Sequence, residues 1–439
     1  MRTFLWALSL LSLLGWMACT PRNAGPISGG PRPNQPGPGK PSPVDTVRWT
    51  TPPGGKPPIG NPGTGGNNSG KLPGNGASYN IALLLPFVSN SGETVNEKSK
   101  PALEFYAGAK VALQQLSEET RINYVVDVLD TKIQDAEFQQ VLANPRVAKA
   151  QVLIGPIRSS HVTLAAEWAK SRKKILISPE TPNAGLVSQF PGFIQINPSL
   201  RSHCAAITAY VRRNHGADQV TLICREKERD RLPYFQESNS AYGGGNLREL
   251  VLPDATVNFD KIDLKPYFKP GKTSVFILPT WSSQDFVMAF MRKLKTQKGN
   301  AKVEVYGMPQ WANFESIEPD YLSLLNVHIS AGRYVDHSTE EVRAFEQEYY
   351  LQTGTIPTPD AYNGYDVMLF CGRQLANYGL AFPEKSAGAN WRGIQSRGKM
   401  SRVSASANTS ADHPEAYDYL ENTGVFILRY GLKGYEPAY

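Results

Sequence analysis

The sequence predicts an α/β protein with two doubly wound parallel-sheet lobes. Short apolar runs alternate with amphipathic segments from residue 79 onward, and the same alternation starts again near residue 200. Continuous apolar runs are typical of strands covered on both faces, and this rhythm indicates a parallel sheet flanked by helices. The chain has 439 residues and 41% hydrophobic residues, which is enough for two separate cores.

The first unit begins at Tyr79 with the apolar run 81–87. Leu103, Phe105, Ala109 and Leu113 then recur at helical spacing. The later elements expected in this unit are strands at 124–129, 152–154 and 175–178, and helices at 135–149 and 161–171.

The second unit repeats this order. Its expected strands are 219–224, 274–278 and 302–306, and its expected helices are 199–214 and 283–297. Two further helices are expected at 339–352 and 360–378.

The first nineteen residues indicate export. A basic start at Arg2 precedes an apolar run from Phe4 to Met17, which is short for a membrane span. Cys19 directly follows Ala18, as in the lipobox of bacterial lipoproteins, although Trp16 and Met17 depart from that pattern. We expect a signal peptide over 1–19 and a lipid, such as palmitate, on Cys19; an ordinary secretory signal is the alternative.

Residues 20–78 are expected to be a disordered tether. They contain 14 Pro and 14 Gly in 59 positions, with few aliphatic residues to bury. This stretch and Arg2 account for six of the seven net positive charges of the chain. The remainder is therefore nearly neutral, which argues against nucleic acid as a partner.

Three cysteines follow the leader: Cys204, Cys224 and Cys371. They lie in apolar stretches, so buried free thiols are expected, with a bridge between Cys204 and Cys224 as the alternative. No Cys or His spacing indicates a metal site, and no cofactor is expected.

Several segments resemble the type I periplasmic-binding-protein fold. They include 81–87, 102–109, Leu153–Pro156 with Ser159, and Ser178-Pro179, followed by 334–336, 362–366 and 424–430. Similar proteins are exported amino-acid transporter substrate-binding proteins, some with a peptidoglycan-binding LysM module. The resemblance implies a ligand cleft between two lobes joined by three crossings. We assign lobe 1 to 79–199 completed by 332–385, and lobe 2 to 200–331 completed by 386–439.

The physics of open parallel sheets places a ligand beyond the carboxyl ends of the strands. The expected ligand-binding residues in the loops there are Ser89, Ser159, Ser160, Ser178, Thr181, Trp281, Gln310 and Trp311. Ser159 and Ser160 begin a helix and would bind a carboxylate or simply cap the helix. Trp281 and Trp311 would flank a ligand or pack between lobes.

Gln310 is a departure from the resemblance. Amino-acid-binding relatives place an acidic residue at the corresponding position of lobe 2 to receive the ammonium group of the ligand. A buried ammonium without a charged partner is costly, so Gln310 weakens an amino-acid assignment.

The sequence contains no complete catalytic motif of the kinds considered. Pro270-Gly271-Lys272-Thr273 resembles the end of a phosphate loop, but Pro266 replaces the required glycine and a strand follows. We therefore expect a non-catalytic protein. The export signal and Cys19 further lead us to expect a location on the periplasmic side of the envelope, with a lipid anchor in the outer membrane.

Two functions remain open. One is a solute receptor that binds an amino acid, peptide or cell-wall fragment for a transporter. The other is an interaction module that regulates a peptidoglycan synthase, similar to the lipoprotein activators of penicillin-binding proteins.

Overall fold

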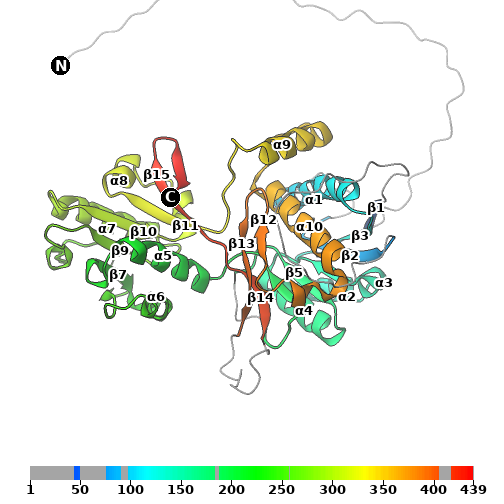
Figure 1. The fold of residues 1–439 in the computed structure, drawn as a ribbon, viewed down its shortest axis with the longest axis horizontal. Helices are drawn as coiled ribbons and strands as arrows, with labels where there is room; N and C mark the ends of the chain where they lie inside the picture. The colour runs from blue at the N-terminus through cyan, green and yellow to red at the C-terminus, as the bar shows by residue number, and fades with distance from the viewer. Residues whose placement is uncertain are drawn as a thin grey trace, which may run out of the picture. The chain divides into compact units, whose positions relative to one another are not determined.

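A computed structural model describes residues 44–49, 76–89, 97–182, 187–256, 258–404 and 417–438. The expected signal peptide and Cys19 lie outside these residues. Two mixed sheets, each covered by helices, confirm the predicted class (Figure 1). No described helix has the length and apolar character needed to span a membrane.

The first sheet has nine strands in the order β1-β3-β2-β4-β5-β6-β14-β13-β12. The six central strands, from β3 to β14 in this order, are parallel to one another. At one edge β1 is antiparallel to β3; at the other edge β13 is antiparallel to β14, and β12 is antiparallel to β13. Its strands are β1 Val44–Trp49, β2 Ser78–Leu85, β3 Asn123–Asp130, β4 Val152–Ile154, β5 Ile175–Ser178, β6 Phe193–Gln195, β12 Asn390–Arg392, β13 Arg397–Val403 and β14 Tyr419–Asn422.

Helices pack around the first sheet through their apolar faces; among them, α9 contacts α1, and α11 contacts α10. The closest helix pair is α1 and α10, where Gly108 and Gly364 leave no space for a Cβ against the backbone of the other helix. The helices are α1 Lys100–Glu119, α2 Asp135–Leu142, α3 Pro145–Lys149, α4 Ser159–Ser171, α9 Glu340–Thr353, α10 Pro359–Tyr378 and α11 Phe382–Lys385. The single helix expected at 135–149 is divided because Pro145 starts a new helix.

The second sheet has seven strands in the order β16-β15-β11-β10-β9-β7-β8, with β15 and β16 antiparallel. Its strands are β7 Val220–Arg225, β8 Arg248–Leu252, β9 Ser274–Ile277, β10 Val303–Gly307, β11 Val327–Ala331, β15 Phe426–Gly431 and β16 Gly434–Pro437. Its helices are α5 Leu200–Asn214, α6 Leu232–Ser240, α7 Gln284–Lys298 and α8 Pro319–Leu324.

The chain crosses between the two sheets three times, as expected. The crossings follow β6, β11 and β14, at 196–199, 332–339 and 423–425. At the first crossing, the carboxylate of Glu421 accepts hydrogen bonds from Ser199 N at 2.7 Å and Ser202 Oγ at 2.6 Å. These hydrogen bonds tie the first crossing and the start of α5 to β14, the strand that precedes the third crossing.

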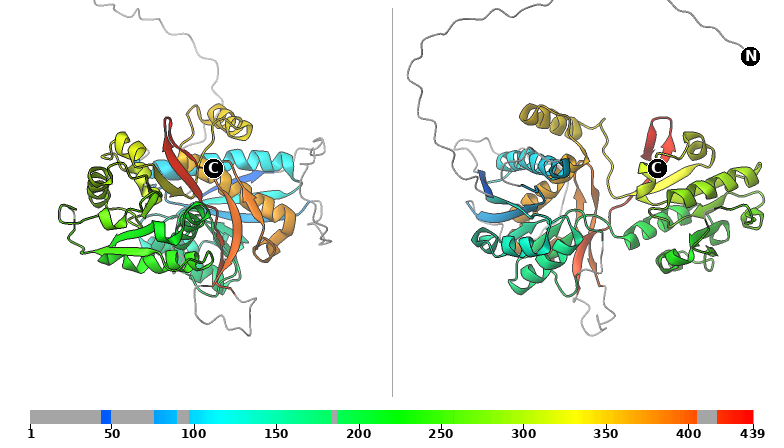
Figure 2. Two further views of the ribbon diagram at one scale, coloured as in Figure 1. Left: turned by 60° about the vertical axis from the view of Figure 1, so that its left-hand side comes forward. Right: turned by 180° about the vertical axis from the view of Figure 1, so that it is seen from behind.

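Two boundary predictions were wrong. The segment 386–422 was assigned to lobe 2, but β12, β13 and β14 extend the first sheet, and only β15 and β16 join the second (Figures 1 and 2). β14 pairs in parallel with β6, so the last crossing comes after Asn422. The sequence did not show this because these strands are short and carry polar residues.

The second correction concerns the tether. Residues 44–49 were expected to be disordered, yet they form β1 along the edge of β3, from Val44↔Leu129 to Trp49↔Tyr124. The segment Val-Asp-Thr-Val-Arg-Trp contains β-branched and aromatic residues, and the unpaired edge of β3 offers backbone partners. The composition of residues 20–78 as a whole, which is dominated by Pro and Gly, did not indicate this short strand.

The three described cysteines, Cys204, Cys224 and Cys371, are free and buried. The alternative of a bridge between Cys204 and Cys224 is therefore wrong in this structure. Burial raises the pKa of all three thiols, that of Cys224 to about 12, so they are protonated core residues.

Candidate ligand-binding site

The carboxyl ends of β2, β4 and β5 lie at one edge of the first sheet because the three strands are parallel neighbours. This edge carries five of the eight predicted ligand residues, at the end of β5 or in the segments that follow the three strands. The prediction therefore placed Ser89, Ser159, Ser160, Ser178 and Thr181 on a common edge of the sheet.

Ser89 is held by the end of β3. Its backbone N and its Oγ each donate to Asp130 Oδ2 at 2.8 Å, and Lys132 Nζ lies 2.9 Å from the same oxygen. Burial acts to raise the pKa of Asp130, but hydrogen bonds from Lys132 and Ser89 outweigh it and lower the pKa. Asp130 and Lys132 were not predicted; an acid at the end of an apolar strand is the signal that could have indicated them.

Ser159 and Ser160 are the first residues of α4, but neither is its N-cap, which is Arg158. Ser160 Oγ instead donates to Asp135 Oδ1 at 2.9 Å, and His161 Nε2 lies 3.3 Å from that oxygen. Ser159 is exposed at the helix N-terminus, where backbone N–H groups favour an anion.

Ser178 and Thr181 are buried at the same edge. The side chain of Ser178 is inaccessible, and its Oγ has no hydrogen-bond partner among the described residues. Thr181 is 3% exposed, and its Oγ1 donates to Ile157 O at 3.4 Å. A buried hydroxyl without a partner is costly, so Ser178 has unused hydrogen-bonding capacity near the expected ligand.

Arg333, which the sequence did not indicate as a site residue, joins this edge to the second crossing. Arg333 Nη1 lies 3.0 Å from Glu180 Oε1, and Nη2 donates to Pro179 O at 2.9 Å. Asn363 of α10 donates to the same carboxylate oxygen. These contacts fix the loop after β5 to the crossing, which the spacing of the residues in the sequence could not reveal.

Asp360 lies near this group, in the first turn of α10. Burial, with repulsion from Glu180 and Glu104, raises its pKa from 3.8 to about 6, against the opposing effect of Arg333. The carboxyl group of Asp360 therefore binds its proton more tightly in the folded protein than in the unfolded chain. Protonated Asp360 therefore adds to the free energy of unfolding below about pH 4, and this contribution is lost as the pH rises through 6.

Asp360→Asn is expected to raise the free energy of unfolding at pH 7.5 by about 1 kcal/mol, because half-exposed charges are partly screened. At pH 4.5 the variant and the parent should differ much less. Urea unfolding at both pH values measures this, with the exposed Asp230→Asn as control. Equal differences at the two pH values would contradict the assignment.

In the second lobe, Trp311 is a core residue rather than a ligand contact, which corrects the prediction. It is 2% exposed, and its Nε1 donates to Thr280 O at 2.8 Å. Its ring lies against Gly307, where any Cβ would approach the ring to 2.3 Å.

Trp281 and Gln310 remain accessible. Trp281 is partly exposed and meets the ring of His203 edge-on at 5.7 Å. Gln310 is exposed in the short turn Pro309–Asn313 that follows β10. Both follow parallel strands of the second sheet, at the edge that the prediction indicated.

A buried ion pair supports this edge and was also missed. Arg225, the last residue of β7, donates from Nη2 to Glu228 Oε1 at 3.0 Å and from Nη1 to Ser283 Oγ at 3.0 Å. Thr280 Oγ1 donates to Glu228 Oε2 at 3.0 Å. Burial acts to raise the pKa of Glu228, but the hydrogen bonds from Arg225 outweigh it and lower the pKa, so Glu228 stays ionised. Its contacts hold the loop containing Trp281.

Within the described residues, no group of three or more His, Cys, Asp or Glu side chains is arranged to hold a metal ion. The two edges offer hydroxyls, a helix N-terminus and a partly exposed indole. Such groups suit hydrogen bonding to a small polar molecule.

A sequence model described as periplasmic binding protein matches residues 79–388. No curated protein matches the chain. Among solved structures, a putative branched-chain amino acid ABC transporter protein from Rhodospirillum rubrum is 13% identical, with a TM-score of 0.58 over 82% of this chain and 99% of that one.

Two other solved structures have the same fold. A Desulfitobacterium hafniense ABC transporter substrate-binding protein in complex with Leu is 14% identical, with a TM-score of 0.52 over 83% of this chain and 100% of that one. A branched-chain amino acid ABC transporter periplasmic ligand-binding protein from Burkholderia xenovorans is 11% identical, with a TM-score of 0.56 over 83% and 94%. At these identities the likeness establishes the fold alone.

Proposed function

Because the chain belongs to the periplasmic binding protein family, we propose that it binds a small polar solute between its two lobes and catalyses no reaction. The observation that carries the proposal is that the parallel strands of two mixed sheets, joined by three crossings, end in segments with polar or aromatic groups. Family membership supports solute binding and does not support the alternative, regulation of a peptidoglycan synthase.

The first lobe supplies the hydrogen-bonding groups of the proposed site. Ser159 would bind an anionic or carbonyl group at the N-terminus of α4, and the free Oγ of Ser178 would add a donor or acceptor. Trp281 and Gln310 would close over the solute from the second lobe. The solute classes we propose are an amino acid, a peptide or a cell-wall fragment, presented to a membrane transporter.

A thermal-shift screen with amino acids, peptides and muropeptides tests this function. A solute at 100 times its dissociation constant should add about 2.7 kcal/mol to the folded state. Ser159→Ala and Trp281→Ala should each weaken or abolish the shift without a large change in the unliganded Tm. Ser171→Ala, at the other end of α4, is the matched control.

Failure of every solute class to shift the Tm would contradict the proposal. A shift that persists in both variants would show that the solute binds elsewhere.

We also propose that the mature protein is a periplasmic lipoprotein anchored through Cys19 in the outer membrane. A lipid on Cys19 would bring the protein to a membrane although no described helix could span one. Cys19→Ala should move the protein from the membrane fraction to the soluble fraction. A parent protein that takes up no labelled fatty acid would overturn the anchor and leave the solute-binding proposal intact.

A further inference from the structure

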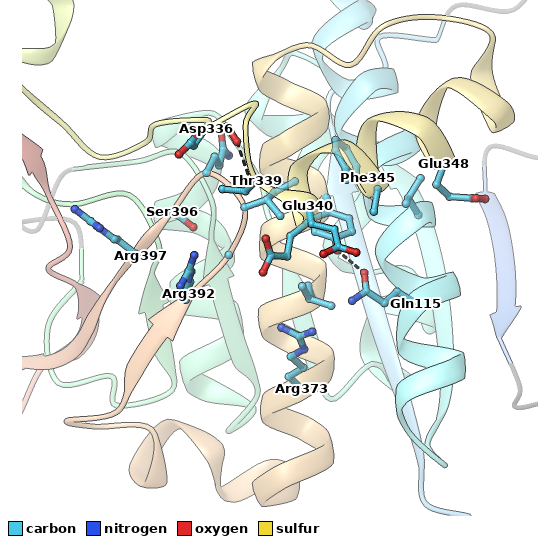
Figure 3. Close-up of a pocket in the computed structure, with 18 of the residues that line it drawn as sticks. Gln115, Asp336, Thr339, Glu340, Phe345, Glu348, Arg373, Arg392, Ser396 and Arg397 are labelled. Atoms are coloured by element: carbon cyan, nitrogen blue, oxygen red, sulfur yellow. Dashed lines mark hydrogen bonds between the residues drawn. The ribbon is translucent and has the colours of Figure 1, made fainter. Parts of the chain in front are cut away.

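A pocket of about 1170 Å³ lies beside two of the crossings, and none of the eight predicted ligand residues lines it (Figure 3). Helices α1, α9 and α10 form one part of its wall, and the turn 392–397 forms another. Tyr334 and Asp336 of the second crossing also line it, as do Phe426 and Pro437 of the second sheet. Its volume is somewhat above the usual range for ligand pockets, about 300–1,000 Å³, and exceeds what one amino acid needs.

The turn 392–397 is held rigidly by Asp366 of α10, which is 1% exposed. Its carboxylate accepts hydrogen bonds from the backbone N of Ile394 at 2.8 Å, Gln395 at 3.1 Å and Ser396 at 3.0 Å. Ser396 Oγ donates to it as well, at 2.8 Å. The turn therefore presents its side chains from a fixed backbone, as a preorganised binding site requires.

Gln395 carries an unused donor at this pocket. The residue is 3% exposed, and its Nε2 has no hydrogen-bond partner among the described residues. Its backbone is fully engaged, since its N donates to Asp366 and its O accepts from Tyr334 N at 2.8 Å. A buried amide without an acceptor is unfavourable, and an acceptor atom of a ligand would satisfy it.

Two arginines flank Gln395 on the same turn. Figure 3 shows Arg392 and Arg397 on the turn side of the pocket. Arg397 lies over the ring of Phe426 at 4.3 Å, and neither arginine forms an ion pair with another described residue. Two guanidinium groups beside an amide donor match a carboxylate.

The α9 side of the pocket carries the opposite charge. Glu340 and Glu341, in the first turn of α9, both line it, and neither forms an ion pair with another described residue. The remaining basic side chain, Arg373, is already paired with Glu119 at 2.7 Å. A ligand with a carboxylate at one end and an ammonium at the other complements this separation of charge.

We propose that the pocket is a second binding site, which takes a short peptide with free termini. Its carboxylate contacts Arg392, Gln395 and Arg397, and its ammonium group faces Glu340 and Glu341. Because the turn is bonded to Tyr334 and stacked on Phe426, an occupied pocket links the second and third crossings and restrains movement between the lobes.

Equilibrium dialysis of the full protein against a random tetrapeptide library with free termini tests this site, with retained peptide measured by mass spectrometry. The parent should retain peptide, and a library amidated at its C-termini should be retained at least tenfold less. Arg392→Ala and Gln395→Met should each reduce retention at least tenfold. The control Lys399→Ala, an exposed residue of β13 outside the pocket, should not.

Gln395→Met also separates a binding role from a structural one. The substitution keeps the backbone contacts with Asp366 and removes an unsatisfied donor, so the Tm should stay unchanged or rise. No retention by the parent would overturn the second site, as would equal retention of the amidated library or undiminished retention by both variants. A solute whose thermal shift survives Arg392→Ala would still support the proposed site between the lobes.

Discussion

Asp366→Ala is expected to lower the free energy of unfolding by about 4 kcal/mol, because three backbone N–H groups and a hydroxyl lose one buried acceptor together. The carboxylate lies between α10 and the turn 392–397, which leads into β13 of the first sheet. Loss of the carboxylate should therefore loosen β12 and β13, which form one edge of the first sheet.

Urea unfolding of Asp366→Ala against the parent measures this loss. Asp230→Ala is the control, since that carboxylate is exposed, and it should change stability by less than about 0.5 kcal/mol. If Asp366→Ala unfolds within about 1 kcal/mol of the parent, the turn does not depend on this acceptor.

Gly364→Ala is expected to cost about 3 kcal/mol or more, and to prevent α1 and α10 from packing as they do in the parent. A Cβ at this position would lie 1.9 Å from the carbonyl oxygen of Phe105, and that atom belongs to the α1 backbone. The reciprocal contact is equally close, because a Cβ on Gly108 would lie 1.9 Å from the carbonyl oxygen of Ala361. Neither helix can yield without disturbing the core of the first lobe.

Gly431→Ala provides the comparison for this substitution. A Cβ on Gly431 would approach its nearest neighbour, Glu436 Oε2, only to 3.4 Å, so this variant should unfold close to the parent. Denaturation midpoints of the two variants measure the difference. Similar midpoints would show that α1 and α10 can separate at little cost.

The fold class was predictable because both sheets are built around continuous apolar strands. Runs such as Ile81–Leu85 and Val152–Ile154 are fully buried, and their composition alone indicates that. The last part of the first sheet was not predictable in this way. β12 and β13 carry several exposed polar residues, and their pairing depends on β14 meeting β6 from far along the chain.

The positions of several candidate site residues in the fold were predictable. The rule that ligands bind beyond the carboxyl ends of parallel strands located Ser89, Ser159 and Ser178 at one edge. It could not show that Trp311 fills the space left by Gly307, because that depends on how the turn after β10 folds back. Nor could it show that Arg333 meets Glu180, since the two residues come together only through the second crossing.

We propose that one solute is held by the carboxyl edges of both sheets. A crystal structure of the protein with the solute found in the thermal-shift screen tests it most directly. The solute is expected to contact Ser159 at the N-terminus of α4 and Trp281 after β9 in the same complex. A solute bound to only one lobe, away from both edges, would contradict it.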